Sequence, residues 1–342
     1  MKAVFISRHG GVGVLQYGER PTPRPGRGEV LVRVRACALN HLDLWVRKGL
    51  PGVEIPFPHI LGCDIAGTVE ALGPGVSGLF RGGRVVVAPG ISCGACRACR
   101  GGGDSLCDRF TILGYRVDGG YAEFATCPAR NIIPVSGKYS FEEWAAVPIV
   151  FLTAYHMLLT RAGLKKGETV LIHASGSGIG SAAIQVARLL GAKVITTAGS
   201  DAKLQKARRL GAHELINYKK RNFVDVVKRL TKGRGVDVAF EHIGPETFTG
   251  SMASLAKGGR LVTCGATSGP KVDLDLRFLF VRHLSILGSY MGSHKELLEV
   301  IRHVEHGRLK PVVDSVFPLK EARAAQARLE SRRQFGKIVL SV

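Results

Sequence analysis

The sequence is poor in acidic residues and has no long apolar segment. It contains 27 Asp and Glu against 48 Lys and Arg, so its formal net charge is +21. No apolar run approaches the ~18 residues that a membrane-spanning helix requires. The first residues, "MKAVFISRHGGVG", also lack the apolar stretch of a secretory signal. We therefore expect a cytoplasmic protein without a membrane partner.

The excess of positive charge is compatible with three explanations. They are nucleic-acid binding, a polyanionic small substrate or cofactor, and a highly charged, heat-adapted surface. The basic residues are spread along the chain, and local clusters such as "YKKRNF" and "ESRRQFGK" are short. Specific nucleic-acid binding is therefore disfavoured. The other two explanations stay open.

The pattern of apolar residues, glycines and prolines changes near residue 140, which predicts two domains. Up to residue 140, short strands alternate with Gly and Pro, as in "EVLVRVRACAL" and "DIAGTVEALG". From 141 to 291, buried strands alternate with helices, which is typical of a parallel sheet covered on both faces. The tail from 292 to 342 is expected to return to the first domain. The predicted fold class is α/β, with a β-rich domain (1–140 and 292–342) and a doubly wound parallel-sheet domain (141–291).

Four of the eight cysteines fall in the stretch "CGACRACRGGGDSLC". The spacing C-x2-C-x2-C-x7-C places four thiolates on one short loop, enough to surround a tetrahedral Zn²⁺ and leave no open position. A redox role would need an exposed thiolate of low pKa. A DNA-binding finger would need a recognition helix where "RFTILGYRVDGGYAEF" reads as strand. The predicted ligands of a structural zinc are Cys93, Cys96, Cys99 and Cys107.

Small residues separate a buried strand from a helix in "VLIHASGSGIGSAA". Glycines there allow a pyrophosphate to approach the backbone at the helix N-terminus, although the strict G-x-G-x-x-G spacing is not present. A tight turn without a ligand is the alternative. The predicted dinucleotide loop consists of Ser175, Gly176, Ser177, Gly178, Ile179 and Gly180.

The following strand, "KVITTAGSDAK", ends on Ala198, where an NAD-selective fold usually has an acidic residue. An apolar strand end followed by Ser200 and Lys203 leaves room for a 2′-phosphate. NADP(H) is therefore expected in preference to NAD(H). Ser200 is also expected to cap the next helix.

Together, the cysteine lobe, the dinucleotide loop and the stretch "GGRLVTCGATSG" resemble the zinc-type medium-chain dehydrogenase/reductase superfamily, over essentially the whole chain. The resemblance implies a GroES-like catalytic domain followed by a Rossmann domain, and a homodimer or homotetramer. It also implies that Thr153 lies near the nicotinamide. The further cofactor-binding residues that it implies are Tyr218, Ile243, Gly265, Ala266 and Lys337.

Zinc alcohol dehydrogenases of this superfamily bind a second, catalytic zinc, and by the resemblance all three ligand positions differ here. With Gly49 fixing the register, Asn40 stands where the first Cys ligand is expected. The "GHE" triplet that supplies the His ligand reads "GCD", which places Cys63 there. Ile149 takes the third position. Asn is a poor zinc ligand and Ile is none.

The acidic neighbours of these positions are retained as Asp43 and Asp64. We expect no catalytic zinc. The alternative is a metal held by Cys63, Asp64 and a nearby histidine, His41 or His59.

Without a Lewis acid, alcohol oxidation needs another base, and no Ser-Tyr-Lys arrangement is evident. A quinone, or a C=C bond conjugated to a ketone or thioester, needs only correct positioning for hydride transfer and a hydrogen-bond donor, such as Asn40, for the developing oxyanion. The sequence therefore predicts an NADPH-dependent reductase of such acceptors, with catalytic residues Asn40, Asp43, Cys63, Asp64 and Thr153.

Two alternatives remain. One is an alcohol or aldehyde dehydrogenase with an atypical metal site. The other is a non-catalytic NADPH- or RNA-binding protein on the same scaffold, an alternative that the net charge of +21 suggests.

Overall fold

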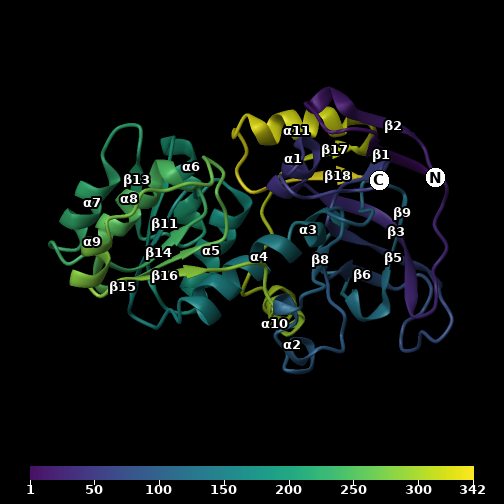
Figure 1. Cartoon of the computed structure of the whole chain (residues 1–342), viewed down its shortest axis with the longest axis horizontal. Coiled ribbons are helices and arrows are strands. Elements are labelled where there is room, and N and C mark those ends of the chain that lie inside the picture. Colours follow the sequence, from purple (N-terminus) through teal and green to yellow (C-terminus); the bar gives the residue numbers. More distant parts are fainter. The chain divides into compact units, whose positions relative to one another are not determined.

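The computed structural model describes residues 1–342 without a gap. The chain separates into two compact units, which Figure 1 shows. One consists of Met1–Ile149 with Ser293–Val342, and the other of Val150–Gly292. Both chain ends therefore belong to the first unit.

The first unit extends past residue 140 because of the helix α3 (Phe141–Ala145), which packs on strands of that unit and buries Trp144 completely. The predicted capping box is present: the Ser140 hydroxyl accepts from the Glu143 N–H, and the Glu143 carboxylate accepts from the Ser140 N–H. A separate helix, α4 (Pro148–Tyr155), begins at the proline, as the sequence predicts.

The first unit is built on a seven-stranded sheet. In it the strands β10-β6-β5-β3-β18-β17 follow one another, and β9 pairs with β3. A three-stranded sheet β2-β1-β4 and the pair β7-β8 complete the unit. The strands are β1 (Lys2–Ile6), β2 (Leu15–Glu19), β3 (Glu29–Ala38), β4 (His59–Ile60), β5 (Asp64–Leu72), β6 (Arg84–Val87), β7 (Gly90–Ile91), β8 (Thr111–Ile112), β9 (Phe124–Pro128), β10 (Ile132–Pro134), β17 (Val313–Pro318) and β18 (Lys337–Ser341), and the helices beside α3 are α1 (His41–Lys48), α2 (Arg97–Arg100), α10 (His294–Glu305) and α11 (Ala322–Glu330).

The second unit is a six-stranded sheet in the order β13-β12-β11-β14-β15-β16, parallel throughout. The order reverses between β11 and β14, the point at which such sheets bind ligands at the carboxyl ends of their strands. The strands are β11 (Thr169–Ile172), β12 (Lys193–Ala198), β13 (Glu214–Asn217), β14 (Val236–Glu241), β15 (Leu255–Thr263) and β16 (Ser285–Gly288), and the helices are α5 (Gly178–Leu189), α6 (Asp201–Arg209), α7 (Phe223–Leu230), α8 (Pro245–Ser254) and α9 (Leu276–Val281).

The apolar strands of the second unit are covered on both faces. Every residue of β11 is buried, and Leu171 packs in a core with Ile195, Ala239 and Leu261 from the neighbouring strands. The predicted α/β fold class is therefore confirmed. None of the helices combines the length and the apolar character that a membrane span needs.

Candidate active site and metal centres

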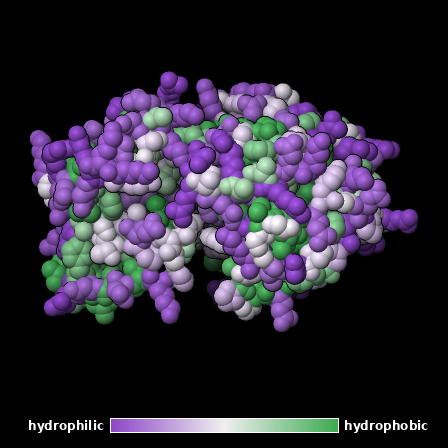
Figure 2. Space-filling model, turned by 90° about the horizontal axis from the view of Figure 1, so that it is seen from above, coloured by the Kyte–Doolittle hydropathy of each residue, from purple (hydrophilic) through white to green (hydrophobic).

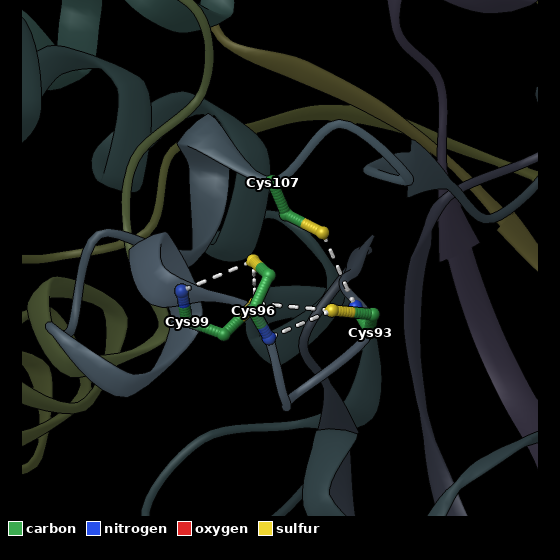
Figure 3. A group of neighbouring side chains, drawn as sticks. All are labelled: Cys93, Cys96, Cys99 and Cys107. Atoms are coloured by element: carbon green, nitrogen blue, oxygen red, sulfur yellow. Dashed lines mark hydrogen bonds between the residues drawn. The ribbon is translucent and has the colours of Figure 1, made fainter.

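The four predicted zinc ligands meet in one lobe of the first unit. Their sulfur atoms all lie within 4.8 Å of one another, and Figure 3 shows the side chains converging around α2. Cys93 and Cys96 come before this short helix, whose first turn Cys96 caps. Because the spacing of the first three cysteines fits one tight turn, the sequence itself brings these sulfurs together.

Backbone N–H groups stabilise thiolates in this lobe. The N–H groups of Ala95 and Cys96 donate to the Cys93 sulfur at 3.4 and 3.3 Å. These two hydrogen bonds are the main reason that the pKa of the Cys93 thiol falls to about 5. Four sulfurs at this spacing form the closed donor set of a tetrahedral zinc site, and the residues present fit that ion.

A second cluster lies deeper in the first unit, around the Asp64 carboxylate. Asp64 begins β5 and is completely buried. Its Oδ2 atom accepts from the Lys337 ammonium at 2.8 Å and from the Asn40 amide at 2.8 Å. Its Oδ1 atom accepts from the Ile149 N–H at 2.8 Å. The carboxylate is therefore satisfied entirely by the protein.

Lys337 also binds Asn40 directly. Its ammonium donates to Asn40 Oδ1 at 2.6 Å, and its side chain is only 4% exposed. The Asn40 amide further approaches the Cys63 sulfur at 3.3 Å and the Ala38 carbonyl at 3.4 Å. The side chain of Asn40 thus has internal partners for both its oxygen and its nitrogen.

Asp43 belongs to the same region through α1, the helix that Asn40 caps. The Asp43 Oδ2 atom accepts from the Asn40 N–H at 2.7 Å and from the Tyr121 hydroxyl at 3.0 Å. Burial nevertheless raises the pKa of Asp43 to about 6. Asp43 therefore anchors the start of α1.

The predicted dinucleotide loop in the second unit forms the turn between β11 and α5. Ser177 caps α5 by accepting from the Gly180 N–H at 2.9 Å. A side chain at Gly180 would come within 2.3 Å of the Ala174 carbonyl, so only glycine fits there. The Ser175 hydroxyl is buried and has no protein partner. An orphaned hydroxyl beside a helix N-terminus fits a phosphate ligand.

The end of β12 carries the residues that were predicted to select NADP(H). Ser200 caps α6 by accepting from the Lys203 N–H at 3.4 Å. The Tyr218 hydroxyl lies over Gly199, where an added Cβ would approach it to 2.7 Å. The nearby Asp201 carboxylate pairs with the Lys220 ammonium at 2.6 Å. The Asp201 carboxylate, at the start of α6, therefore already has a cationic partner.

Comparison with known proteins agrees with these two units. A family model described as "Alcohol dehydrogenase GroES-like domain" matches residues 26–137, and one described as "Zinc-binding dehydrogenase" matches residues 178–306. A quinone oxidoreductase of Rattus norvegicus is 30% identical over 348 residues, covering 99% of this chain and 97% of the relative.

The chain belongs to the zinc-type medium-chain dehydrogenase/reductase superfamily. It is an oxidoreductase of that superfamily. A solved NAD-dependent alcohol dehydrogenase is 48% identical, with a TM-score of 0.97 and complete coverage of both chains. A crotonyl-CoA carboxylase/reductase solved with NADP is 26% identical, with a TM-score of 0.91, and the match covers 100% of this chain and 95% of the other.

The catalytic zinc of the superfamily does not fit the residues around Asp64. Its expected ligand positions hold an amide, a thiol and an isoleucine, and an ammonium already lies between Asn40 and Asp64. Burial raises the pKa of the Cys63 thiol well above its usual range, which disfavours the thiolate that zinc binds. In the whole chain, the four-cysteine lobe is the only group of three or more His, Cys, Asp or Glu side chains close enough to hold a metal.

The histidines named as alternative ligands have other surroundings. His59 is buried in the first unit, where its Nε2 atom contacts the Gly114 carbonyl at 3.2 Å. Its Nδ1 atom lies 3.6 Å from the Asp118 carboxylate. The ring of His41 lies beside that of Trp45, 6.3 Å between centroids. Neither histidine joins Cys63 and Asp64 in a metal-binding group.

The remaining predicted residues occupy several places. Thr153 is buried within α4, and the Ile243 N–H donates to the Glu241 carboxylate at 2.7 Å. Gly265 packs against the His242 carbonyl, which an added Cβ would approach to 3.1 Å, and the Ala266 carbonyl accepts from the Gly269 N–H. Lys337, expected beside the cofactor, donates to Asp64 and Asn40. The sequence offers one indication that this cation is buried, because Lys337 is the first residue of the apolar strand "KIVLSV".

The raised pKa of Asp43 predicts a stability that depends on pH. Because the folded state holds this proton more tightly than the unfolded chain, the free energy of unfolding falls as pH rises from about 4 to about 6. Asp43→Asn keeps an acceptor for both hydrogen bonds and removes the titration. Relative to the wild type, this variant should gain up to ~3 kcal/mol across that interval, at 1.4 kcal/mol per pKa unit.

Urea unfolding at a series of pH values measures this difference. Asp225→Asn, a change at an exposed position of α7, is the control and should follow the wild type at every pH. Parallel curves for Asp43→Asn and the wild type would contradict the prediction.

Proposed function

We propose that the protein is an NADPH-dependent reductase that transfers hydride to a quinone or to an activated C=C bond of the enone or enoyl-CoA type. One structural zinc is held by the four-cysteine lobe, and no metal takes part in the reaction. The observation that carries this proposal is the contact of the Lys337 ammonium with Asn40 and Asp64. An ammonium fixed there leaves no space for a metal ion, and it already compensates the negative charge of Asp64.

The chemistry of the acceptor follows from that arrangement. Without a metal, the site cannot polarise an alcohol or a simple carbonyl by Lewis acidity. A quinone or a conjugated C=C bond is already electron-poor, so positioning against the hydride donor is the main requirement. When bound, the reduced nicotinamide supplies the hydride. The quinone oxidoreductase and the crotonyl-CoA carboxylase/reductase to which this chain is similar support this acceptor class.

The roles of the cluster residues change with the geometry. Asn40 was expected to donate to a substrate oxyanion, but its amide already has partners in Asp64, Cys63 and Ala38. We therefore assign Asn40 and Asp64 to holding Lys337 in place. Asp43 fixes the start of α1, and Thr153 is retained as the residue proposed to contact the nicotinamide.

The cofactor would be held by the second unit. The turn Ser175–Gly180 offers the N-terminus of α5 and the orphaned Ser175 hydroxyl to the pyrophosphate. The strand β12 ends on Ala198, without the acidic residue that binds a ribose 2′-hydroxyl, and Ser200, Lys203 and Tyr218 are the residues proposed to bind a 2′-phosphate.

Metal content and acceptor range separate this proposal from its main rival, an alcohol dehydrogenase with an atypical metal. That rival is favoured by the 48% identical alcohol dehydrogenase structure. We expect one zinc per chain in the purified protein, close to none in Cys99→Ser, and NADPH oxidation by quinones or enones that added zinc does not increase. Two zinc ions per chain together with alcohol oxidation would establish the rival. Cofactor binding without turnover of any acceptor would favour the non-catalytic alternative.

Cofactor preference tests the role of Lys203. Removing a charge-assisted contact to a 2′-phosphate in Lys203→Ala should weaken NADPH binding about tenfold and change NADH binding less than twofold. Lys228→Ala, at an exposed position of α7, is the matched control. Dissociation constants come from the fluorescence of the bound reduced nicotinamide. Tighter binding of NADH than of NADPH by the wild type would refute the cofactor assignment.

We also propose that the protein forms a homo-oligomer through the edge of its parallel sheet. The edge strand β16 pairs only with β15, and no strand lies on its other side, where the Gly288 carbonyl accepts from Arg161. The neighbouring α9 exposes Leu276, Phe280 and Val281 by more than 60% each. Figure 2 shows hydrophobic residues gathered on the part of the second unit where α7, α8 and α9 lie in Figure 1. Apolar residues beside an open edge favour self-association.

The oligomer is tested by Phe280→Asp. This change places a charge in the proposed contact and should reduce the molar mass in light scattering from a multiple of 36.7 kDa to that of one chain. Phe80→Asp alters an equally exposed phenylalanine of the first unit and should leave the mass unchanged. A monomeric wild type would refute the proposal.

The cellular location is proposed to be the cytoplasm. No disulfide joins any of the eight cysteines, which suits a reducing compartment.

A further inference from the structure

The second unit contains a buried carboxylate that the proposed function does not use. Glu241 ends β14 and is completely buried. Its Oε1 atom accepts from the N–H groups of His242, Ile243 and Gly244 at 2.9, 2.7 and 3.2 Å. The Thr247 hydroxyl contacts both oxygens at 2.9 Å. One side chain thereby shapes the whole turn between β14 and α8.

The other oxygen of Glu241 connects to the dinucleotide loop. Its Oε2 atom accepts from the Ser251 hydroxyl at 2.8 Å, and the Ser251 oxygen lies 2.8 Å from His173 Nε2. His173 Nδ1 in turn lies 3.2 Å from the Thr197 hydroxyl. The chain of contacts runs from the end of β14, through α8, to the residue that follows β11.

The direction of each hydrogen bond follows from the ionisation of the two ends. Burial opposes the charge on Glu241, but the interaction with His173 and the hydrogen bonds it accepts outweigh burial and hold its pKa below the usual value. Burial lowers the pKa of His173 to about 4. At neutral pH, an ionised Glu241 can only accept, so Ser251 donates to it and receives the Nε2–H of a neutral His173. Nδ1 then accepts from Thr197.

This chain ends on the backbone of the dinucleotide loop. The Thr197 hydroxyl accepts from the Ala174 N–H at 3.3 Å, and the Thr197 carbonyl accepts from the Ser175 N–H at 2.9 Å. The His173 carbonyl accepts from His242 Nε2 at 3.1 Å. Ala174 has φ of 48°, a left-handed conformation that is uncommon for alanine and needs such support.

We infer that Glu241 is a positioning residue for dinucleotide binding: through Ser251 and His173 it sets the loop after β11, and through backbone N–H groups it sets the loop after β14. It acts through these groups and is not a ligand of the cofactor. The inference rests on the proposed function, because the loop after β11 is the proposed pyrophosphate site and the loop after β14 holds Ile243, which the family resemblance places among the cofactor-binding residues. The Glu241 carboxylate couples the two loops, because the hydrogen bonds that hold each loop lead to this one buried charge.

The decisive variant is Glu241→Gln in the full-length protein. A glutamine amide presents hydrogens to Ser251, so the Ser251 hydroxyl must turn and donate to His173 Nε2. The proton of His173 then moves to Nδ1, which leaves the Thr197 hydroxyl hydrogen without its acceptor. In ¹⁵N-histidine spectra, the wild type should show the Nε2–H tautomer of His173 and the variant the Nδ1–H tautomer. The His173 signal is assigned by its loss in His173→Gln.

Binding is measured on the same proteins. Glu241→Gln should weaken NADPH binding about tenfold, with kcat at saturating NADPH within twofold of the wild type, because only the binding geometry is disturbed. Ser251→Ala cuts the connection without touching the carboxylate and should weaken binding similarly. If Glu241→Gln does not fold, Ser251→Ala carries the test. Glu299→Gln, at a partly exposed position of α10 where the side chain pairs with Arg302, is the control and should match the wild type in both measurements.

The failures are distinguishable. Wild-type affinity for NADPH in Glu241→Gln or Ser251→Ala, while the wild type itself binds NADPH, overturns the inference and leaves the proposed function intact. An Nδ1–H tautomer already present in the wild type also overturns it. A wild type that binds neither NADPH nor NADH refutes the proposed function, and the inference fails with it.

Discussion

The buried polar cluster in the core of the first unit depends on the ion pair between Lys337 and Asp64. Both groups are almost completely buried, so each would be costly alone. Together, and with the Asn40 amide bonded to both, they form a set of polar groups that needs no cation from outside. The same cluster joins the starts of β5 and β18 to the residue that caps α1. The Asp64 carboxylate and its partners thereby form a self-contained element of the protein core.

The second unit meets a similar problem with a different solution. Glu241 has no positive partner of fixed charge, and it is stabilised instead by backbone N–H groups and two hydroxyls. In the first unit the carboxylate neutralises a side chain, whereas in the second it organises loops. The two buried carboxylates thus show how burial can be used either to complete a packed core or to set the geometry of a binding surface.

The features that were predictable from the sequence are those encoded within short stretches. The cysteine lobe, the turn from Ser175 to Gly180 and the capping box at Ser140 each lie within about one turn of structure, so spacing alone indicates them. The alternation of strands and helices indicates the parallel sheet in the same way. The sequence does not indicate the helix α1, because this helix is short and Asn40 at its start also matches a zinc-ligand position of the superfamily.

The features that were missed depend on contacts between distant residues. Lys337 meets Asp64 across 273 positions of sequence, and no local pattern distinguishes a lysine that binds a carboxylate from one that binds a phosphate. His173 and Ser251 are likewise 78 positions apart. Only the sheet order, which places β11 beside β14 and β18 beside β3, brings these partners together.

That separation has a consequence for how the protein is made. During synthesis, the strand with Asp64 leaves the ribosome long before the strand with Lys337. Until then the carboxylate lacks its counter-charge, and closing the apolar interior around it is unfavourable. The first unit must therefore wait for almost the whole chain, while the parallel sheet, whose strands are contiguous in sequence, is free to fold ahead of it. A chain cut short before β18 would lack the ammonium, and its Asp64 carboxylate would have no counter-charge.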